Sequence, residues 1–253
     1  MQNGIFHPRF SIHSWNDDDT ANEPWMHPEV ADRVRAAIEL RYRLLPYLYT
    51  CLWQSVEHHE PMLRPTFLDH PTDEQCYEDC DDFMLGPSLL VASVVEPEQT
   101  TRRVYLPDNG VGWWDYGGLE WYAGGQFVDI AVGLDSIPLF VRAGTCLPES
   151  PGATRATAQA DRVRELKVYP LMAPGSQQSW LYEDDGESEN APFSLLGFDV
   201  TLQGNDHVLA MQQFGQADPV VPIATLVLAG ELKGIAIGPD WHPAGSQISF
   251  TSR

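Results

Sequence analysis

The sequence predicts a mainly β chain in which a helical segment precedes two antiparallel β-sandwiches. Apolar residues recur at helical spacing only between residues 28 and 60. After them, short strand-like runs alternate with turns rich in Gly, Pro and Asp. A small, polar stretch at residues 150–160 divides these runs into two groups and is typical of a linker. The expected domains are residues 1–60, 61–150 and 151–253.

The helical segment is the clearest local pattern. Pro28 suits a first helical position, since its missing N–H would have no partner there. One apolar stripe then follows at helical spacing: Val30, Val34, Ile38, Tyr42 and Leu45. Pro46 should kink or split the helix because its ring clashes with the preceding turn. A second helical part is expected to run to about Glu57, with an apolar face that must pack on another element.

The strand-like runs follow one another without helices between them, which favours antiparallel sandwiches over a parallel sheet. The first group contains Leu89–Val95, Val104–Pro107, Phe127–Val132 and Ile137–Gly144. Runs such as RELKVYPL and FDVTLQG predict a second sandwich after residue 160.

The charge balance excludes several partners. The chain has 15 Lys and Arg against 36 Asp and Glu, a formal net charge of -21. Such a field repels nucleic acid and anionic lipid, so neither is an expected partner. No stretch has the length of a transmembrane helix, and MQNGIFHPRF lacks the pattern of a signal peptide. Localisation stays open.

Clusters of potential metal ligands are all better explained without a metal. Cys76 and Cys80 have no second Cys or His pair at matching spacing. Two groups of neighbouring aspartates also occur, Asp17–Asp19 and the set Asp79, Asp81 and Asp82. Neighbouring carboxylates point in different directions and rarely converge on one metal ion. The run Asp184–Glu187 lacks the alternating ligands of a calcium loop and predicts a turn. We expect no metal and no cofactor.

Five aromatic residues fall on one predicted hairpin: Trp113, Trp114, Tyr116, Trp121 and Tyr122. Aromatic faces bind sugar rings, so a non-catalytic carbohydrate-binding module is one interpretation. Core packing or a domain interface is the more common use of such residues in a sandwich.

Several motifs in order resemble glycoside hydrolase family 31, which includes α-glucosidases and α-xylosidases. The first is a loop with the pattern F-x-P-x-x-x-x-H, here Phe6, Pro8 and His13, followed by Glu23-Pro24-Trp25. The segment Arg41–Tyr49, RYRLLPYLY, is similar to a helix of that family. Further similar stretches are Phe83–Gly86, Leu89–Ala92, Arg103–Pro107, Trp113–Tyr116, Gly124-Gly125, Ile137–Gly144 and Leu181–Gly186.

The resemblance implies a (β/α)8 barrel with appended β-sandwiches and a retaining mechanism carried by two aspartates about 5 Å apart. Those aspartates lie on barrel strands upstream of the helical zone. A full barrel takes roughly 250 residues, so residues 1–60 would supply only its end. We therefore expect no catalytic residue in this chain and no activity in isolation.

His13 is the one substrate-binding residue that the resemblance implies. A histidine at this position contacts sugar hydroxyls in the family, and an imidazole can donate with one nitrogen and accept with the other. The family often has an Arg two residues earlier, where this chain has Ser11, so substrate choice stays open. The implied partners are a carbohydrate substrate and, through residues 28–60, either the missing barrel or another copy of the chain. A purely structural sandwich that supports a barrel remains the other interpretation.

Overall fold

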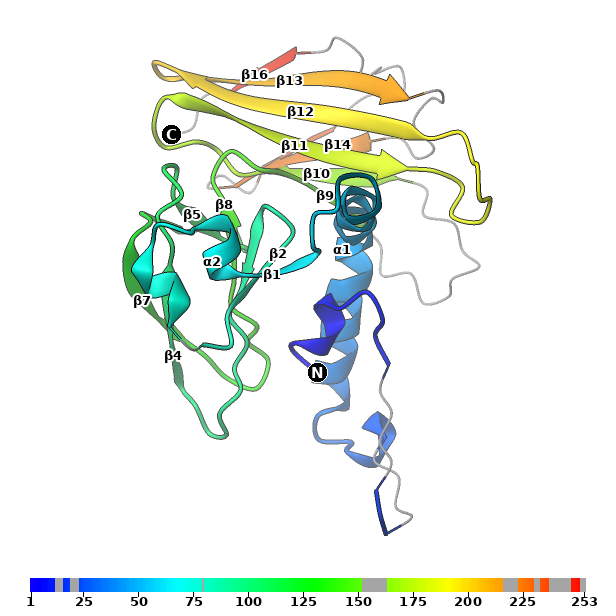
Figure 1. Cartoon of the computed structure of the whole chain (residues 1–253), viewed down its shortest axis with the longest axis vertical. Coiled ribbons are helices and arrows are strands. Elements are labelled where there is room, and N and C mark those ends of the chain that lie inside the picture. The colour runs from blue at the N-terminus through cyan, green and yellow to red at the C-terminus, as the bar shows by residue number, and fades with distance from the viewer. Residues whose placement is uncertain are drawn as a thin grey trace.

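The computed structural model describes residues 1–11, 16–18, 23–78, 80–151, 163–215, 223–229, 233–236 and 247–250. In these residues the chain is mainly β. A long helix, α1, lies beside one group of strands and beneath a second group (Figure 1). The predicted fold class, a helical segment followed by antiparallel sandwiches, is confirmed.

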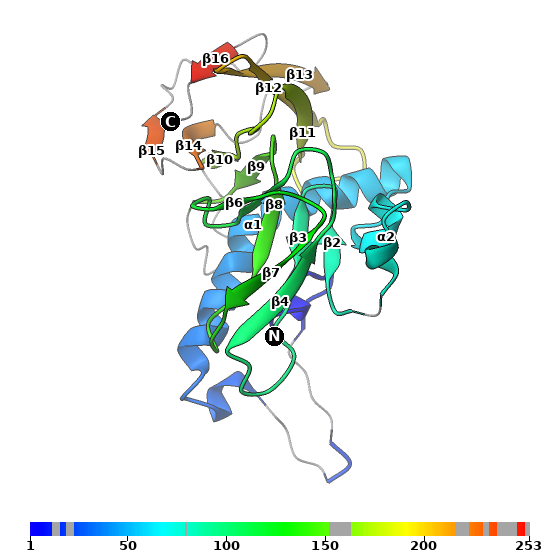
Figure 2. The same cartoon turned by 90° about the vertical axis from the view of Figure 1, so that its left-hand side faces the viewer.

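Helix α1 (Ala31–His58) contains both predicted helical parts. Pro46 lies inside it, and the two halves of α1 run in different directions (Figure 2). The proline therefore kinks the helix and does not split it. Packing of the helix on both sides of Pro46 compensates for the backbone hydrogen bond that proline cannot make. The helix begins at Ala31 and not at Pro28, which lies in the turn before it. The 3-10 helices η1 (Gly4–Phe6) and η2 (Pro24–Met26) precede it.

The first group of strands forms one large sheet and one strand pair. The large sheet has the order β1 (Leu63–Pro65), β2 (Phe83–Leu85), β3 (Leu89–Val91), β8 (Leu139–Arg142), β5 (Trp113–Asp115), β6 (Trp121–Tyr122). The pair is β4 (Thr101–Leu106) with β7 (Gln126–Ala131). Two short helices, α2 (Thr66–Asp69) and η3 (Glu74–Tyr77), lie between β1 and β2.

The second group forms two four-stranded sheets. One has the order β15 (Lys233–Ala236), β14 (Ile223–Leu228), β10 (Arg164–Val168), β9 (Cys146–Glu149). The other has the order β11 (Gly175–Glu183), β12 (Ser194–Gln203), β13 (Asp206–Gly215), β16 (Gln247–Phe250). All pairs are antiparallel except β10 with β14. Strand β9 precedes the domain boundary expected at residue 150, yet it pairs with β10.

Helix α1 shares its apolar core with both groups of strands. The same core contains Leu44 of α1, Leu85 of β2 and Leu147 of β9. Tyr169, which follows β10, is fully buried in it. A separate core fills each sandwich. The helix is therefore the element on which the two sandwiches are mounted.

The first sandwich approaches α1 closely where Gly86 meets the helix, and a substitution there tests this packing. Its φ is +57°, and a Cβ there would overlap the Cys51 thiol and the Tyr47 hydroxyl. We expect Gly86→Ala to lower the free energy of unfolding by about 3 kcal/mol, since a left-handed alanine costs about 1–2 kcal/mol and forced overlap adds about 1–3 kcal/mol. Urea denaturation measures the change.

Gly110→Ala is the matched control. Gly110 has a φ of +75°, but a Cβ added to it would have no atom within 4 Å. It should lose only about 1 kcal/mol. Equal losses in the two variants would mean that the contact with α1 is not tight.

Candidate functional site

The chain ahead of His13 is held to α1 by Arg41. His13 itself, the sequence-predicted substrate contact, lies outside the described residues. The Arg41 guanidinium donates hydrogen bonds to the carbonyls of Ile5 (2.5 Å), His7 (2.7 Å) and Pro8 (3.0 Å). Charged donors make the stronger protein hydrogen bonds. Through Arg41, the helix motif Arg41–Tyr49 is therefore bonded directly to the motif that contains Phe6 and Pro8.

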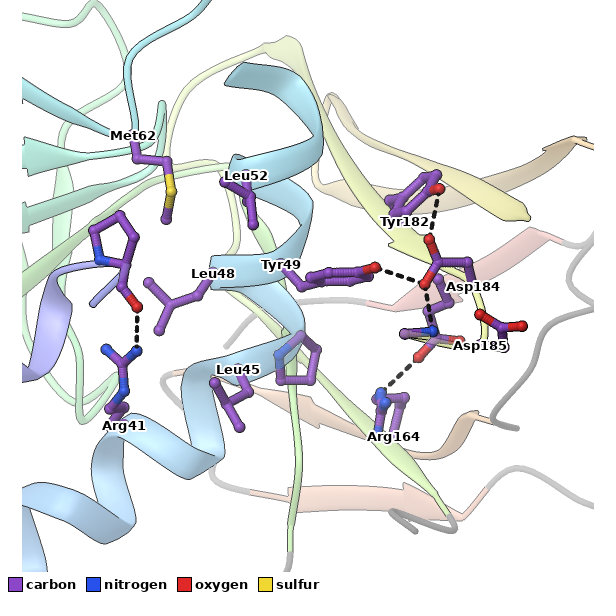
Figure 3. Close-up of a pocket in the computed structure, with 14 residues that line it drawn as sticks. Arg41, Leu45, Leu48, Tyr49, Leu52, Met62, Arg164, Tyr182, Asp184 and Asp185 are labelled. Carbon is purple, nitrogen blue, oxygen red and sulfur yellow. Dashed lines mark hydrogen bonds and ion pairs between the residues drawn. The ribbon is translucent and has the colours of Figure 1, made fainter. Parts of the chain in front are cut away.

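A groove of about 440 Å³ runs along α1 beside Pro46 (Figure 3). Its apolar wall includes Leu45, Leu48 and Leu52 of the helix, together with Met62. Carboxylates after β11 form the far rim, as Figure 3 shows for Asp184. The groove thus combines an apolar helix face with a polar edge, which is typical of an interface between domains.

A tyrosine from each side meets Asp184 at this rim. The hydroxyl of Tyr49, on α1, donates to Asp184 Oδ1 at 2.6 Å, and that of Tyr182, on β11, donates to Oδ2 at 2.9 Å. Trp53 stacks on Tyr182 with ring centroids 5.2 Å apart. Burial and the carboxylate raise the pKa of Tyr182 to about 12 and that of Tyr49 further. Both phenols therefore stay protonated and act as donors.

The neighbouring carboxylate, Asp185, organises a turn. Its Oδ1 accepts from the amides of Glu187 (3.0 Å) and Ser188 (2.8 Å), and its Oδ2 accepts from the Ser188 hydroxyl (2.6 Å). The bonds from Ser188 lower the pKa of Asp185. The predicted turn at Asp184–Glu187 is present, and the Gly186 amide also donates to Asp184 Oδ1 at 2.8 Å, so each carboxylate accepts from at least one backbone amide of the turn.

A buried carboxylate, Glu149 of β9, lies where α1 and both sandwiches meet. It is 1% exposed. Its Oε1 accepts from the Tyr116 hydroxyl at 2.8 Å, and its Oε2 lies 3.8 Å from Nη1 of Arg43. Lys167 donates to the Tyr116 carbonyl at 2.5 Å. Burial raises the pKa of Glu149, which these partners oppose.

The aromatic hairpin does not offer a sugar-binding face. Trp113 is fully buried and Trp114 is 6% exposed. Their indole N–H groups donate to the carbonyls of Pro107 and Pro170, both at 2.8 Å. Only Trp121 is substantially exposed, at 37%. Core packing therefore explains the cluster, and the structure gives no support to sugar binding on the surface of this hairpin.

Among the described residues, the other clusters singled out in the sequence do not gather three ligands around one point. Cys76 is buried and Cys80 exposed; burial raises the pKa of both thiols, that of Cys76 to about 11, which disfavours metal-binding thiolates. Asp82 forms an ion pair with Arg102. Asp17 and Asp18 have exposed positions, while Asp19 and Asp79 lie outside the described residues.

The described residues contain neither a metal-ligand cluster nor a membrane-crossing helix. No group of three or more His, Cys, Asp or Glu side chains in that part of the chain could hold a metal ion. No helix there is both long enough and apolar enough to cross a membrane.

Two family models match the chain in tandem. The model of the glycosyl hydrolases family 31 TIM-barrel domain matches residues 1–51, and that of the glycosyl hydrolase family 31 C-terminal domain matches residues 59–147. The chain belongs to glycosyl hydrolase family 31. It corresponds to the carboxyl-terminal part of its relatives in that family.

Similar family 31 proteins are much longer. The chain is 36% identical to neutral alpha-glucosidase C of Mus musculus over 74% of this chain and 21% of the mouse protein. It is also 36% identical to an alpha-xylosidase of Saccharolobus solfataricus, over 65% of this chain and 22% of that protein. It thus spans about a fifth of the length of these relatives.

Solved structures of the family have the same fold. A Flavobacterium johnsoniae dextranase, complexed with glucose, superposes with a TM-score of 0.79 at 27% identity, over 90% of this chain and 28% of that one. An alpha-xylosidase of Xanthomonas citri gives 0.75 at 25% identity, over 100% of this chain and 28% of the other.

Arg41 can be tested as the anchor of the loop that leads to His13. We expect Arg41→Ala to speed hydrogen exchange at the amides of Ile5 and His7 roughly 10- to 30-fold, because the lost bonds are worth about 2 kcal/mol. Mass spectrometry of the amino-terminal peptide measures the exchange. Arg33→Ala is the control, since Arg33 donates only to an exposed carbonyl in the turn before the same helix. Unchanged exchange in the Arg41 variant would contradict the anchoring role.

Proposed function

We propose that this chain is the carboxyl-terminal part of a retaining α-glycosidase that hydrolyses terminal α-linked glucosyl or xylosyl residues. The observation that carries the proposal is the tandem family match, in which the TIM-barrel model ends at residue 51 and the C-terminal-domain model begins at residue 59. Alpha-glucosidases and an alpha-xylosidase are among the relatives. The retaining mechanism follows from the family resemblance, which implies a pair of aspartates about 5 Å apart.

We further propose that the two catalytic aspartates are not in these 253 residues. Among the described residues ahead of α1 there are two short 3-10 helices and no strand. Barrel enzymes carry their catalytic groups at the carboxyl ends of several different strands. The single long helix is therefore support for a catalytic barrel and does not itself hold the reacting groups.

His13 is our proposed contact to the substrate. Arg41 holds the backbone up to Pro8 against α1, which favours a fixed starting point for the segment that leads to this histidine. A neutral imidazole has one donor and one acceptor, which suits a pair of neighbouring sugar hydroxyls. Its role is to orient the sugar, with the chemistry left to the aspartates of the barrel.

The rest of the barrel is our proposed occupant of the apolar groove on α1. Four side chains form an exposed stripe on this helix: Leu45 at 36%, Tyr49 at 37%, Leu52 at 41% and Val56 at 64%. A contiguous apolar surface of this kind marks an interaction site. The match to the TIM-barrel model covers residues 1–51 and so includes much of α1. Neighbouring barrel elements are therefore the expected partners of this apolar stripe.

The first test is activity. We expect the purified chain to release no nitrophenol from nitrophenyl α-glucoside or nitrophenyl α-xyloside, because the aspartates that attack and protonate the glycosidic bond are absent. The rate is followed by absorbance. Turnover that follows the chain through purification, and that disappears when one of its own aspartates is changed to Asn, would overturn the proposed inactivity.

The second test is self-association. Without its barrel, the stripe should pair with a second copy, so the chain should sediment as concentration-dependent oligomers. Leu52→Glu should return it to monomer by placing a charge in the contact. The control is Leu119→Glu, since Leu119 is 63% exposed but lies in the turn between β5 and β6 and is not part of the stripe. A wild-type chain that stays monomeric at high micromolar concentration would argue against a barrel-docking face.

A further inference from the structure

A second cavity, of about 310 Å³, lies in the first sandwich, away from the groove on α1. Residues from four elements or their ends line it, including Asp69 of α2, Met84 of β2, Trp113 of β5 and Arg142 of β8. Its volume is at the lower end of the range for small-molecule sites. It can therefore hold one compound of about the size of a single sugar ring.

Arg142 is the unusual member of this cavity. Its Nε is buried and has no hydrogen-bond partner among the described residues. Its Nη2 makes only a long bond, 3.4 Å, to the Asn109 carbonyl, and it forms no ion pair with a carboxylate of the described residues. Buried donors are normally satisfied because an unpaired one costs roughly 1–3 kcal/mol. A guanidinium left this way beside a cavity points to a ligand that supplies acceptors.

The rim of the same cavity supplies two carboxylates, which accept hydrogen bonds, and the ring of His70, which can both donate and accept. One oxygen of Asp108 accepts from the Gly110 amide (3.0 Å), and one oxygen of Asp69 accepts from Arg64 (2.9 Å). In the described part of the chain the second oxygen of each carboxylate has no hydrogen bond, so it can accept one from a ligand. Burial lowers the pKa of His70, which favours the uncharged form of its ring. It stands edge-on to the Trp113 ring, with centroids 6.4 Å apart.

The balance of these groups selects the ligand. An anion would meet Arg142 but also the carboxylates of Asp69 and Asp108, within a chain of net charge -21. A cation would meet the like charge of the Arg142 guanidinium. A neutral compound with several hydroxyls satisfies both kinds of group, because each hydroxyl can donate to a carboxylate and accept from Arg142.

We propose that this cavity is a binding site for a neutral polyhydroxylated ring, a single monosaccharide unit, held by Arg142, Asp108 and His70. The site is independent of the proposed hydrolytic function, since it lies on the first sandwich and uses none of the residues that α1 presents to a barrel. It would let the sandwich hold a sugar whether or not the catalytic part is present.

The experiment is saturation-transfer NMR of the whole chain with D-glucose and, separately, with inorganic phosphate. Glucose should bind in the millimolar range and phosphate should not. Arg142→Gln should weaken glucose binding at least about 10-fold, in line with the loss of a charged donor. Arg103→Gln is the matched control. Arg103, on strand β4, lies over the ring of Phe127, on strand β7, and lines no part of this cavity.

Asp108→Asn gives a second, gentler variant, because an Asn oxygen can still accept from the Gly110 amide. It should also weaken glucose binding, and it carries the test if Arg142→Gln fails to fold by circular dichroism. Three results would overturn the proposal. The first is that the wild-type chain does not bind glucose. The second is that it binds glucose but neither folded variant binds it more weakly. The third is that the wild-type chain binds phosphate and not glucose, and that Asp108→Asn strengthens the phosphate binding.

Discussion

The buried carboxylate of Glu149 constrains how the helix and the two sandwiches meet. A charge with so little access to water must be neutralised by partners placed around it. Those partners come from separate elements: Tyr116 from the first sandwich, Arg43 from α1 and Lys167 from the second. The Ser150 amide next to it also donates to the Arg43 carbonyl at 2.9 Å. Moving any one element would take away one of the partners that this buried charge needs.

The same carboxylate links stability to pH. Because burial raises its pKa in the folded chain, the folded state binds this proton more tightly than the unfolded state does. The resulting stabilisation is complete below the ordinary pKa of a glutamate and is lost as the pH rises through the raised pKa. Tyr116, Arg43 and Lys167 limit that loss. Breaking a buried pair by removing one partner costs more than the pair contributes, so the junction tolerates little change.

Much of this architecture could be predicted from sequence because the relevant physics is local. The apolar stripe before Pro46, the missing N–H of that proline and the turns after each strand are properties of neighbouring residues. The motif RYRLLPYLY is recognisable in the sequence, but the contacts of its members are not. Arg41, Tyr47 and Tyr49 each contact a different segment, the last of them Asp184, 135 residues away. Such contacts depend on the packing of whole elements, which no local pattern encodes. For the same reason the burial of Trp113, the pairing of β9 with β10 and the cavity at Arg142 could not be inferred.

The kinked helix has one consequence for how the sequence can vary. Arg41 lies before Pro46 and Tyr49 after it, and each is bonded to a segment on its own side. One residue inserted between them would rotate the rest of the helix by about 100° and advance it by about 1.5 Å. The Tyr49 hydroxyl would then turn away from Asp184 while Arg41 stayed in place. Insertions and deletions should therefore be excluded from this short stretch of helix, even where individual side chains are free to change.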